Sequence, residues 1–326
     1  MRRRDLLMVL GGIAAGASRA QAQPSRMPVI GYVGPENPGP FASRLKAFRE
    51  GLSEAGFVEG QNVAVEFRWA EGRYDRLPEL AADLVARRVD LIVAPGGAPV
   101  ALAAKSATSR TPIVFEMGGD PVAVGVVTSL SQPGGNITGV SSLSVEVSRK
   151  RLEFMHELLP DAGRLAVLMN PTSPTASLQL ANLQSTAEAL GIGIEVLQAG
   201  NEQDFEAAFR TAAQLKPGGL VFSSDPYFAN RSQQLAALAM QHAVPAITQS
   251  RDFPAAGGLM SYGGDFTQSH RQAGLYAGRI LKGEKPAQLP VQQVTKVELF
   301  LNLKAAAALK VRIPSSLTTM ADVTIE

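Results

Sequence analysis

The chain has 326 residues, of which 45% are apolar and 18% are charged, a composition that excludes intrinsic disorder and indicates a folded protein. Removing an export leader at residues 1–22 leaves 304 residues, and because a single hydrophobic core stops growing at roughly 250–300 residues, two lobes are expected. Those 304 residues carry 27 basic and 28 acidic side chains, and a net charge of −1 gives no indication of a basic surface that would bind nucleic acid. The absence of cysteine excludes disulfides, thiolate catalysis and cysteine-bound zinc.

Residues 1–22 have the three parts of a cleaved signal peptide. A basic start, Arg2-Arg3-Arg4, precedes an apolar stretch from Leu6 to Ala17, and Ala20-Gln21-Ala22 suits a signal peptidase. The apolar stretch is too short to span a bilayer, which takes about 20 residues. The arginine pair is typical of a twin-arginine leader, and the ordinary secretory route stays open as an alternative. We therefore expect the mature chain in the periplasm or outside the cell, and not embedded in the membrane.

Short β-rich runs alternate with helical patterns from Pro28 onward, which is typical of βαβ units with parallel sheets. The first predicted strands are Val29–Val33, Val63–Trp69, Leu91–Ala94 and Ile113–Glu116. The helices predicted between them are Phe41–Ala55, Tyr74–Arg87 and Ala98–Ala107. After Asn136–Ser141 the pattern starts again, so the sequence predicts a second lobe of the same kind.

The second lobe and the tail complete the predicted architecture. The predicted helices are Val145–Leu158, Thr175–Leu190, Glu202–Leu215 and Ala229–Gln241, and the predicted strands are Leu165–Met169, Ile194–Leu197, Leu220–Ser223 and Pro245–Thr248. The tail adds a strand at Leu259–Tyr262, a helix at Phe266–Leu281, an extended segment at Val291–Leu301 and a helix at Leu303–Leu309. We expect residues 27–142 plus 258–290 to form one lobe and residues 143–257 plus 291–326 to form the other. The chain is then expected to cross between lobes near residues 142, 257 and 290.

Loops rich in glycine, proline and small polar residues follow six of the predicted strands, at residues 34–38, 95–99, 117–121, 170–174, 224–227 and 263–265. Ligands of parallel α/β sheets bind at the carboxyl ends of strands, so two lobes that face each other with these loops would enclose a cleft. A single loop of this composition is also common between a strand and a helix of any α/β protein, whether or not it binds a ligand. The candidate ligand contacts are Pro35, Phe41, Gly97, Ala98, Gly119, Asp120, Asn170, Ser173, Ser224, Asp225, Tyr227, Gly264 and Asp265.

Carboxylates and aromatic rings are the most specific groups among these candidates. Asp225 and Asp265 suit a ligand ammonium group, and the alternative for both is a helix N-cap. Asp120 precedes a proline, which favours a structural role. Tyr227 is the preferred aromatic wall of the cleft, and Phe41 is a second ring that could stack on a flat ligand.

Four ordered stretches carry a family resemblance. They are residues 51–63 (GLSEAGFVEGQNV), 118–122 (GGDPV), 132–140 (QPGGNITGV) and 280–286 (ILKGEKP). They resemble the substrate-binding proteins of ABC transporters in the group related to tryptophan and tyrosine uptake components, over essentially the whole mature chain. The resemblance implies a type I periplasmic binding fold, in which two flavodoxin-like α/β lobes with parallel sheets are joined by a three-strand hinge and hold a small ligand between them. It also implies an ABC permease and ATPase as partners, and we expect a monomer without a cofactor.

The chain departs from this family at two candidate positions. Relatives often have a hydroxyl residue in place of Ala98, so a ligand carboxylate would depend on backbone N–H groups here. Many have a threonine-serine pair in place of Gly264-Asp265, and the added carboxylate of Asp265 favours a cationic or amino-bearing ligand. An aromatic amino acid is therefore one candidate ligand among several.

Enzymatic and sensory functions are the alternatives to transport. The three histidines have no metal-ligand spacing, and the sequence lacks a Gly-x-Ser-x-Gly elbow, a phosphate-binding loop and a dinucleotide fingerprint. A two-lobed α/β hydrolase or isomerase would need a nucleophile–base pair, and no such pair is evident. A sensor that presents its closed form to a membrane receptor would use the same cleft as a transport protein. The sequence leaves these alternatives open and favours a periplasmic solute-binding component of an ABC importer.

Overall fold

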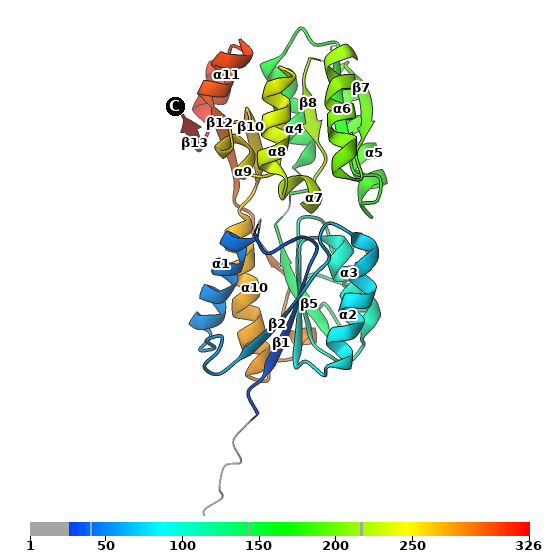
Figure 1. Ribbon diagram of the computed structural model, residues 1–326, viewed down its shortest axis with the longest axis vertical. Coiled ribbons are helices and arrows are strands. Elements are labelled where there is room, and N and C mark those ends of the chain that lie inside the picture. The colour runs from blue at the N-terminus through cyan, green and yellow to red at the C-terminus, as the bar shows by residue number, and fades with distance from the viewer. Residues whose placement is uncertain (1–25, 40, 143, 146, 216–217) are drawn as a thin grey trace, which may run out of the picture.

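The protein consists of two α/β lobes placed end to end along its long axis (Figure 1). This computed structural model describes residues 26–326 except residues 40, 143, 146, 216 and 217. The predicted signal peptide at residues 1–22 lies outside the described residues. Within them, no helix combines the length and the apolar character needed to cross a membrane.

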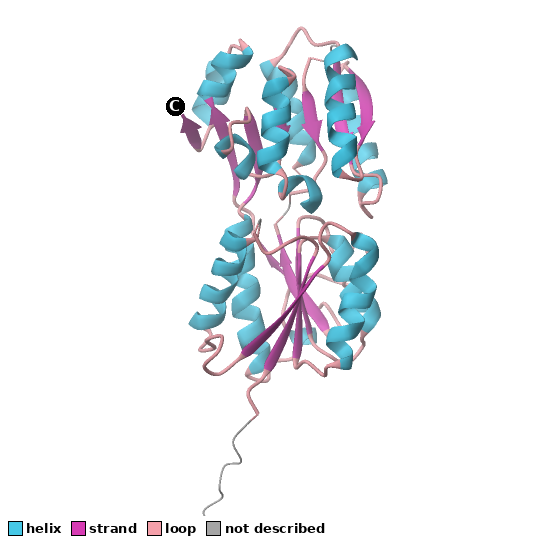
Figure 2. Ribbon diagram, viewed as in Figure 1, coloured by secondary structure: helices cyan, strands magenta, loops and turns pink. Residues whose placement is uncertain are grey.

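The sheet of the first lobe has six parallel strands in the order β11-β5-β4-β3-β1-β2. They are β1 (Val29–Gly34), β2 (Ala64–Trp69), β3 (Leu91–Pro95), β4 (Ile113–Met117), β5 (Ile137–Ser141) and β11 (Gln292–Gln293). The helices of this lobe are α1 (Ala42–Glu54), η1 (Tyr74–Arg76), α2 (Leu77–Ala86), α3 (Ala98–Ala107), α10 (Phe266–Leu281) and η2 (Pro286–Gln288). The central strands β3 and β4 are buried along their whole length, because α2 and α3 cover one face of the sheet and α1 and α10 cover the other (Figure 2).

The sheet of the second lobe has seven strands in the order β13-β12-β10-β9-β8-β6-β7. They are β6 (Arg164–Met169), β7 (Gly193–Gln198), β8 (Leu220–Phe222), β9 (Ala246–Thr248), β10 (Met260–Gly264), β12 (Val297–Asn302) and β13 (Val323–Ile325). The helices are α4 (Ser148–Leu158), α5 (Ala176–Leu190), α6 (Glu202–Leu215), α7 (Pro226–Ala229), α8 (Ser232–Gln241), α9 (Asp252–Ala255), α11 (Leu303–Leu309) and α12 (Ser315–Met320). Strands β6 to β10 are parallel and end on one edge of the sheet, whereas β12 pairs antiparallel with β10, so β12 and β13 run in the opposite direction.

The chain crosses between the lobes three times, and the structure corrects two of the three predicted positions. The first crossing follows β5, close to residue 142 as predicted. The predicted strand Leu259–Tyr262 is β10, which pairs with β9 and β12 in the second sheet, so the second crossing lies at Asp265 and not near residue 257. The predicted segment Val291–Leu301 divides into β11 of the first sheet and β12 of the second, which moves the third crossing from residue 290 to residues 294–296. Strand periodicity identifies a strand but does not say which sheet it joins.

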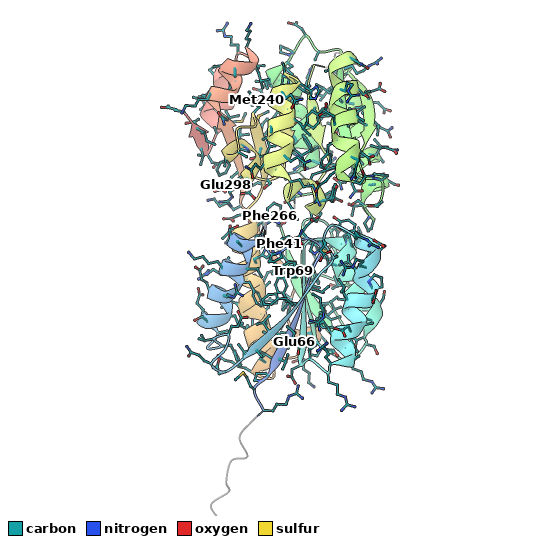
Figure 3. The ribbon with its side chains drawn as sticks, in the orientation of Figure 1. Phe41, Glu66, Trp69, Met240, Phe266 and Glu298 are labelled. Carbon is teal, nitrogen blue, oxygen red and sulfur yellow. The ribbon has the colours of Figure 1, made fainter. Side chains whose placement is uncertain are left out.

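Close packing of α1 on α10 attaches the segment after the second crossing to the first lobe. A Cβ atom on Gly51 would overlap the carbonyl oxygen of Arg271, and one on Gly274 would overlap the carbonyl oxygen of Phe48. The two helix backbones are therefore in contact, which only glycine allows at these positions. This contact fixes the beginning of α10, and with it Phe266, at the edge of the first lobe that faces the second (Figures 1 and 3).

Candidate ligand site between the lobes

A cavity of about 40 Å³ lies where the strand ends of the two lobes face each other. The first lobe contributes loops after β3 and β4 and the first turns of α1 and α10, and the second contributes loops after β6, β8 and β9. Its lining residues are Arg44, Gly96, Gly97, Ala98, Pro99, Glu116, Met117, Gly118, Gly119, Val145, Ser173, Thr175, Ser224, Pro226, Ala229, Gln249 and Phe266. Both sheets therefore present carboxyl ends of their parallel strands to one small cavity, as ligand sites of α/β proteins do.

The structure brings five of the thirteen candidate residues to this cavity and places eight elsewhere. Those that line it are Gly97, Ala98, Gly119, Ser173 and Ser224. Those that are not among the lining residues are Pro35, Phe41, Asp120, Asn170, Asp225, Tyr227, Gly264 and Asp265. The candidates that line the cavity are small residues of the loops. Most of the polar or aromatic candidates that do not line it have partners within the protein.

The loop after β3 needs glycine at two consecutive positions. Gly96 and Gly97 have φ angles of +99° and +96°, in the region that side-chain-bearing residues rarely adopt. Both N–H groups donate to the carbonyl oxygen of Glu116 at 3.1 Å, which joins this loop to the end of β4. A Cβ atom on Gly96 would lie 2.6 Å from Pro35, so that proline packs against the back of the loop.

Asp225 is buried beside the cavity and connects the two lobes. Its Oδ1 accepts hydrogen bonds from the Tyr74 hydroxyl at 2.8 Å, the Asn170 amide at 3.3 Å and the Tyr227 backbone N–H at 2.8 Å. The last of these bonds caps α7, which is the alternative that the sequence left open for this residue. Burial raises the pKa of Asp225 above its usual value. Because Tyr74 belongs to the first lobe, its bond to Asp225 exists only while the lobes are together.

Asp265 and Asp120 both cap the residues that follow them. Asp265 accepts from the N–H groups of Thr267 and Gln268, at 2.9 and 3.1 Å, and forms an ion pair of 2.6 Å with Arg251. Partial burial acts to raise the pKa of Asp265, but these hydrogen bonds and Arg251 outweigh it and lower the pKa. Asp120 accepts from the N–H of Val122 at 2.7 Å, in agreement with the structural role that its proline neighbour favoured.

The two aromatic candidates are turned into the lobes. Tyr227 packs on Phe205 in the second lobe, and the Arg231 guanidinium lies 3.8 Å from the centre of its ring. Phe41 is fully buried and packs edge-on against Trp69 in the first lobe. The aromatic side chain that does line the cavity is Phe266, at the start of α10, which lies at the junction of the lobes in Figure 3.

Two charged cavity residues were not among the candidates predicted from the sequence. Arg44 is 5% exposed and Glu116 is 3% exposed, and both belong to the first lobe. The Arg44 guanidinium lies 4.9 Å from the ring centres of both Phe41 and Phe266, and its Nη1 donates to Asn230 of the second lobe at 3.0 Å. A signal for Glu116 was present in the sequence, because it is the one charged residue in the buried strand β4.

Arg151 is a fully buried cation in the second lobe, next to the first crossing. Its Nη1 donates to the carbonyl oxygens of Ser144 at 3.1 Å and Tyr262 at 2.9 Å, and its Nη2 donates to the hydroxyl of Ser224. Among the described residues no carboxylate lies within ion-pair distance of it. Burial lowers its pKa to about 9. The side chain thus ties the crossing segment to β10 and to a cavity residue through hydrogen bonds.

The lobes are in direct contact, so the structure represents a closed arrangement. Besides the Tyr74–Asp225 and Arg44–Asn230 bonds, Glu36 of the first lobe accepts from Arg231 of the second at 2.9 Å. Burial raises the pKa of Glu36 to about 7, although Arg231 acts in the opposite direction. All three contacts join the two lobes and would break if the lobes moved apart.

Acid is expected to favour this closed arrangement. In an open form Glu36 faces water, where a carboxyl group returns to its ordinary pKa of about 4.3. Because the closed form holds the proton more tightly, with a pKa of about 7, closure takes up a proton. Ligand affinity should therefore rise as the pH falls from about 7 to about 5, by less than tenfold per pH unit.

Titration calorimetry of wild type and Glu36→Gln at several pH values checks this prediction. An affinity that falls with acid, or an unchanged pH dependence in the variant, would contradict it. The carboxyl group of Asp225 lies close enough to Glu36 to raise its pKa. The pKa of Asp225 is itself raised by burial, so proton uptake by Asp225 also favours the closed form in acid.

The two lobes, the three crossings and the enclosed cavity define a type I periplasmic binding fold. The chain matches the family model described as ABC transporter substrate binding protein over residues 36–325, and it belongs to this family. A curated relative, the tyrosine-binding protein of Clostridioides difficile, is 27% identical over 266 residues, which cover 81% of this chain and 75% of that protein.

Solved structures share this fold. A conserved domain protein from Vibrio cholerae has a TM-score of 0.84 at 27% identity, covering 92% of this chain and all of that one. A domain from Streptococcus pneumoniae in complex with L-Trp has a TM-score of 0.80 at 24% identity, covering 91% and 100%. A ligand-free, open substrate binding protein from Clostridium difficile has a TM-score of 0.63 at 24% identity, covering 92% and 100%.

Proposed function

We propose that this protein is the periplasmic solute-binding component of an ABC importer, and that it captures a small amino-acid-like or aromatic ligand between its lobes by hinge closure. The observation that carries the proposal is the cavity lined by strand-end loops of both lobes, with interlobe hydrogen bonds around it. A ligand that touches both lobes stabilises the closed form over the open one, and no chemistry on the ligand is required.

Membership of the family supports the transport role, and an ABC permease with its ATPase is the partner to which the closed form would dock. The predicted signal peptide at residues 1–22 supports export to the periplasm. The higher TM-score with the L-Trp complex than with the open, ligand-free protein is consistent with a closed arrangement here. The tyrosine-binding relative makes aromatic amino acids the first ligands to test.

The cavity of about 40 Å³ has room for only a few water molecules, so the lobes must part to admit an amino acid. A thermal-shift screen of residues 23–326 against amino acids, aromatic acids, small amides, sugars and nucleobases tests the proposal. A ligand at 100 times its Kd is expected to add about 2.7 kcal/mol to the free energy of unfolding. A protein that no compound of the panel stabilises, or that converts one of them into a product, would contradict the proposal.

A further inference from the structure

The cavity between the lobes contains one buried side chain of each charge. Glu116 lies at the end of β4, and Arg44 lies in the first turn of α1. Both are more than nine-tenths buried and both line the cavity. Burying a charged group is unfavourable unless an opposite charge or several hydrogen bonds compensate for the lost hydration. The partners of each group therefore indicate what a bound ligand must supply.

Glu116 has no positively charged partner in the described part of the chain. Its Oε1 accepts from the Ser269 hydroxyl at 2.9 Å, and its Oε2 has a weak contact of 3.4 Å with the N–H of Gly96. The nearest ionisable nitrogen is Nε2 of His270, at 3.9 Å from Oε2. Burial lowers the pKa of His270, so this ring is neutral near pH 7 and provides no charge. A cationic group in the cavity would compensate for the buried carboxylate.

In the part of the chain that the structure describes, most donors of Arg44 have no protein partner. A guanidinium has five N–H donors, and the described residues provide one hydrogen bond, to Asn230 at 3.0 Å. The carboxylate nearest to it, that of Asp252, is 4.0 Å away and has a mostly exposed side chain. The rings of Phe41 and Phe266, both 4.9 Å from the guanidinium, hold it in place without using its donors. An anionic group in the cavity would use them.

We infer that the ligand is a zwitterion, whose cationic nitrogen binds Glu116 and whose carboxylate binds Arg44. This inference rests on the proposed function and adds to it the residues that select the ligand class. The two groups belong to different elements of one lobe and, among the described residues, form no ion pair with each other, so each is free to bind one charged group of the same small molecule. The second lobe then covers the ligand with Ser173, Ser224 and Gln249. An α-amino acid has the required charges, whereas an amine, a carboxylic acid or a sugar has one of them or neither.

Calorimetry with three probes tests the inference: L-tyrosine, tyramine, which lacks the carboxylate, and 3-(4-hydroxyphenyl)propionate, which lacks the amine. Wild type is expected to bind L-tyrosine at least tenfold more tightly than either analogue, from a charge-assisted bond of about 1.5–3 kcal/mol. Glu116→Gln should lower the affinity for L-tyrosine by about 10–100-fold and keep the affinity for the propionate within about threefold of the wild-type value. Arg44→Met should weaken the binding of L-tyrosine more than the binding of tyramine, so the ratio of the two affinities becomes smaller. Exposed Glu79→Gln is the matched control and should change neither ratio.

The ratios separate recognition from a general loss of folding or closure, because either loss would weaken all three probes together. Equal losses for L-tyrosine and the propionate in Glu116→Gln would overturn the assignment of Glu116, and unchanged ratios in both variants would overturn the inference. A wild-type protein that binds sugars or nucleobases of the screening panel and no amino acid would also overturn it, while leaving in place the part of the proposed function that concerns solute capture by closure of the lobes. A protein that binds nothing in the panel would contradict both.

Discussion

Arg151→Ala is expected to lower the free energy of unfolding by about 3 kcal/mol, which is a large part of the stability of an ordinary domain. The substitution leaves the buried carbonyl oxygens of Ser144 and Tyr262 without their donor and opens a space beside β10. It also removes a cation whose burial is unfavourable, as its pKa of about 9 shows, so the loss is smaller than the sum of its bonds. Urea unfolding followed by circular dichroism measures the effect.

The matched control for this prediction is Arg149→Ala, on the same helix α4. Arg149 is exposed, and an exposed substitution of this kind usually changes stability by less than about 0.5 kcal/mol. A loss of less than about 1 kcal/mol in Arg151→Ala would mean that the buried guanidinium stabilises little more than it destabilises. The role assigned to it at the first crossing would then be wrong.

Tyr74→Phe is expected to weaken ligand binding by about 10–100-fold while changing the stability of the separate lobes little. The Tyr74 hydroxyl donates to Asp225 across the lobes at 2.8 Å, and this bond contributes about 1–3 kcal/mol, which is the cost of leaving a buried acceptor without its donor. That contribution exists in the closed form only, so its loss reduces the population that is competent to hold the ligand. Calorimetry with the tightest ligand of the panel measures the change.

Tyr276→Phe is the control for the interlobe bond. Tyr276 also donates from its hydroxyl, to the carbonyl oxygen of Pro290 at 2.6 Å, but both residues belong to the first lobe. This variant should lose stability and keep its affinity. If Tyr74→Phe binds within about threefold of wild type, the Tyr74–Asp225 bond does not contribute to closure.

The alternation of strand and helix patterns was sufficient to predict two α/β lobes and the first crossing, because periodicity and length distinguish buried strands from amphipathic helices. It was not sufficient to assign β10, since a short apolar strand can join either of two parallel sheets. The extended segment Val291–Leu301 posed the same problem, because its two halves pair with different sheets. Partner choice depends on contacts far away in the sequence.

The site shows a similar division. Loop residues such as Gly97 and Ser224 were predicted because strand order alone places the ends of parallel strands on one edge. Arg44 and Glu116 were missed because they lie within a helix and a strand: α1, which carries Arg44, is positioned by its packing on α10, and Glu116 at the end of β4 accepts a hydrogen bond from Ser269 of α10. Tyr227 was expected to form a wall, but its ring is buried more favourably against Phe205 in the second lobe.

Small-angle X-ray scattering of residues 23–326, with and without the tightest ligand of the screening panel, tests most directly whether the lobes close on a solute. The account predicts that the ligand-free protein has a larger radius of gyration, since it samples open forms, and that saturating ligand reduces it towards the value calculated for the closed structure. A radius of gyration that is the same with and without saturating ligand would contradict closure as the basis of binding.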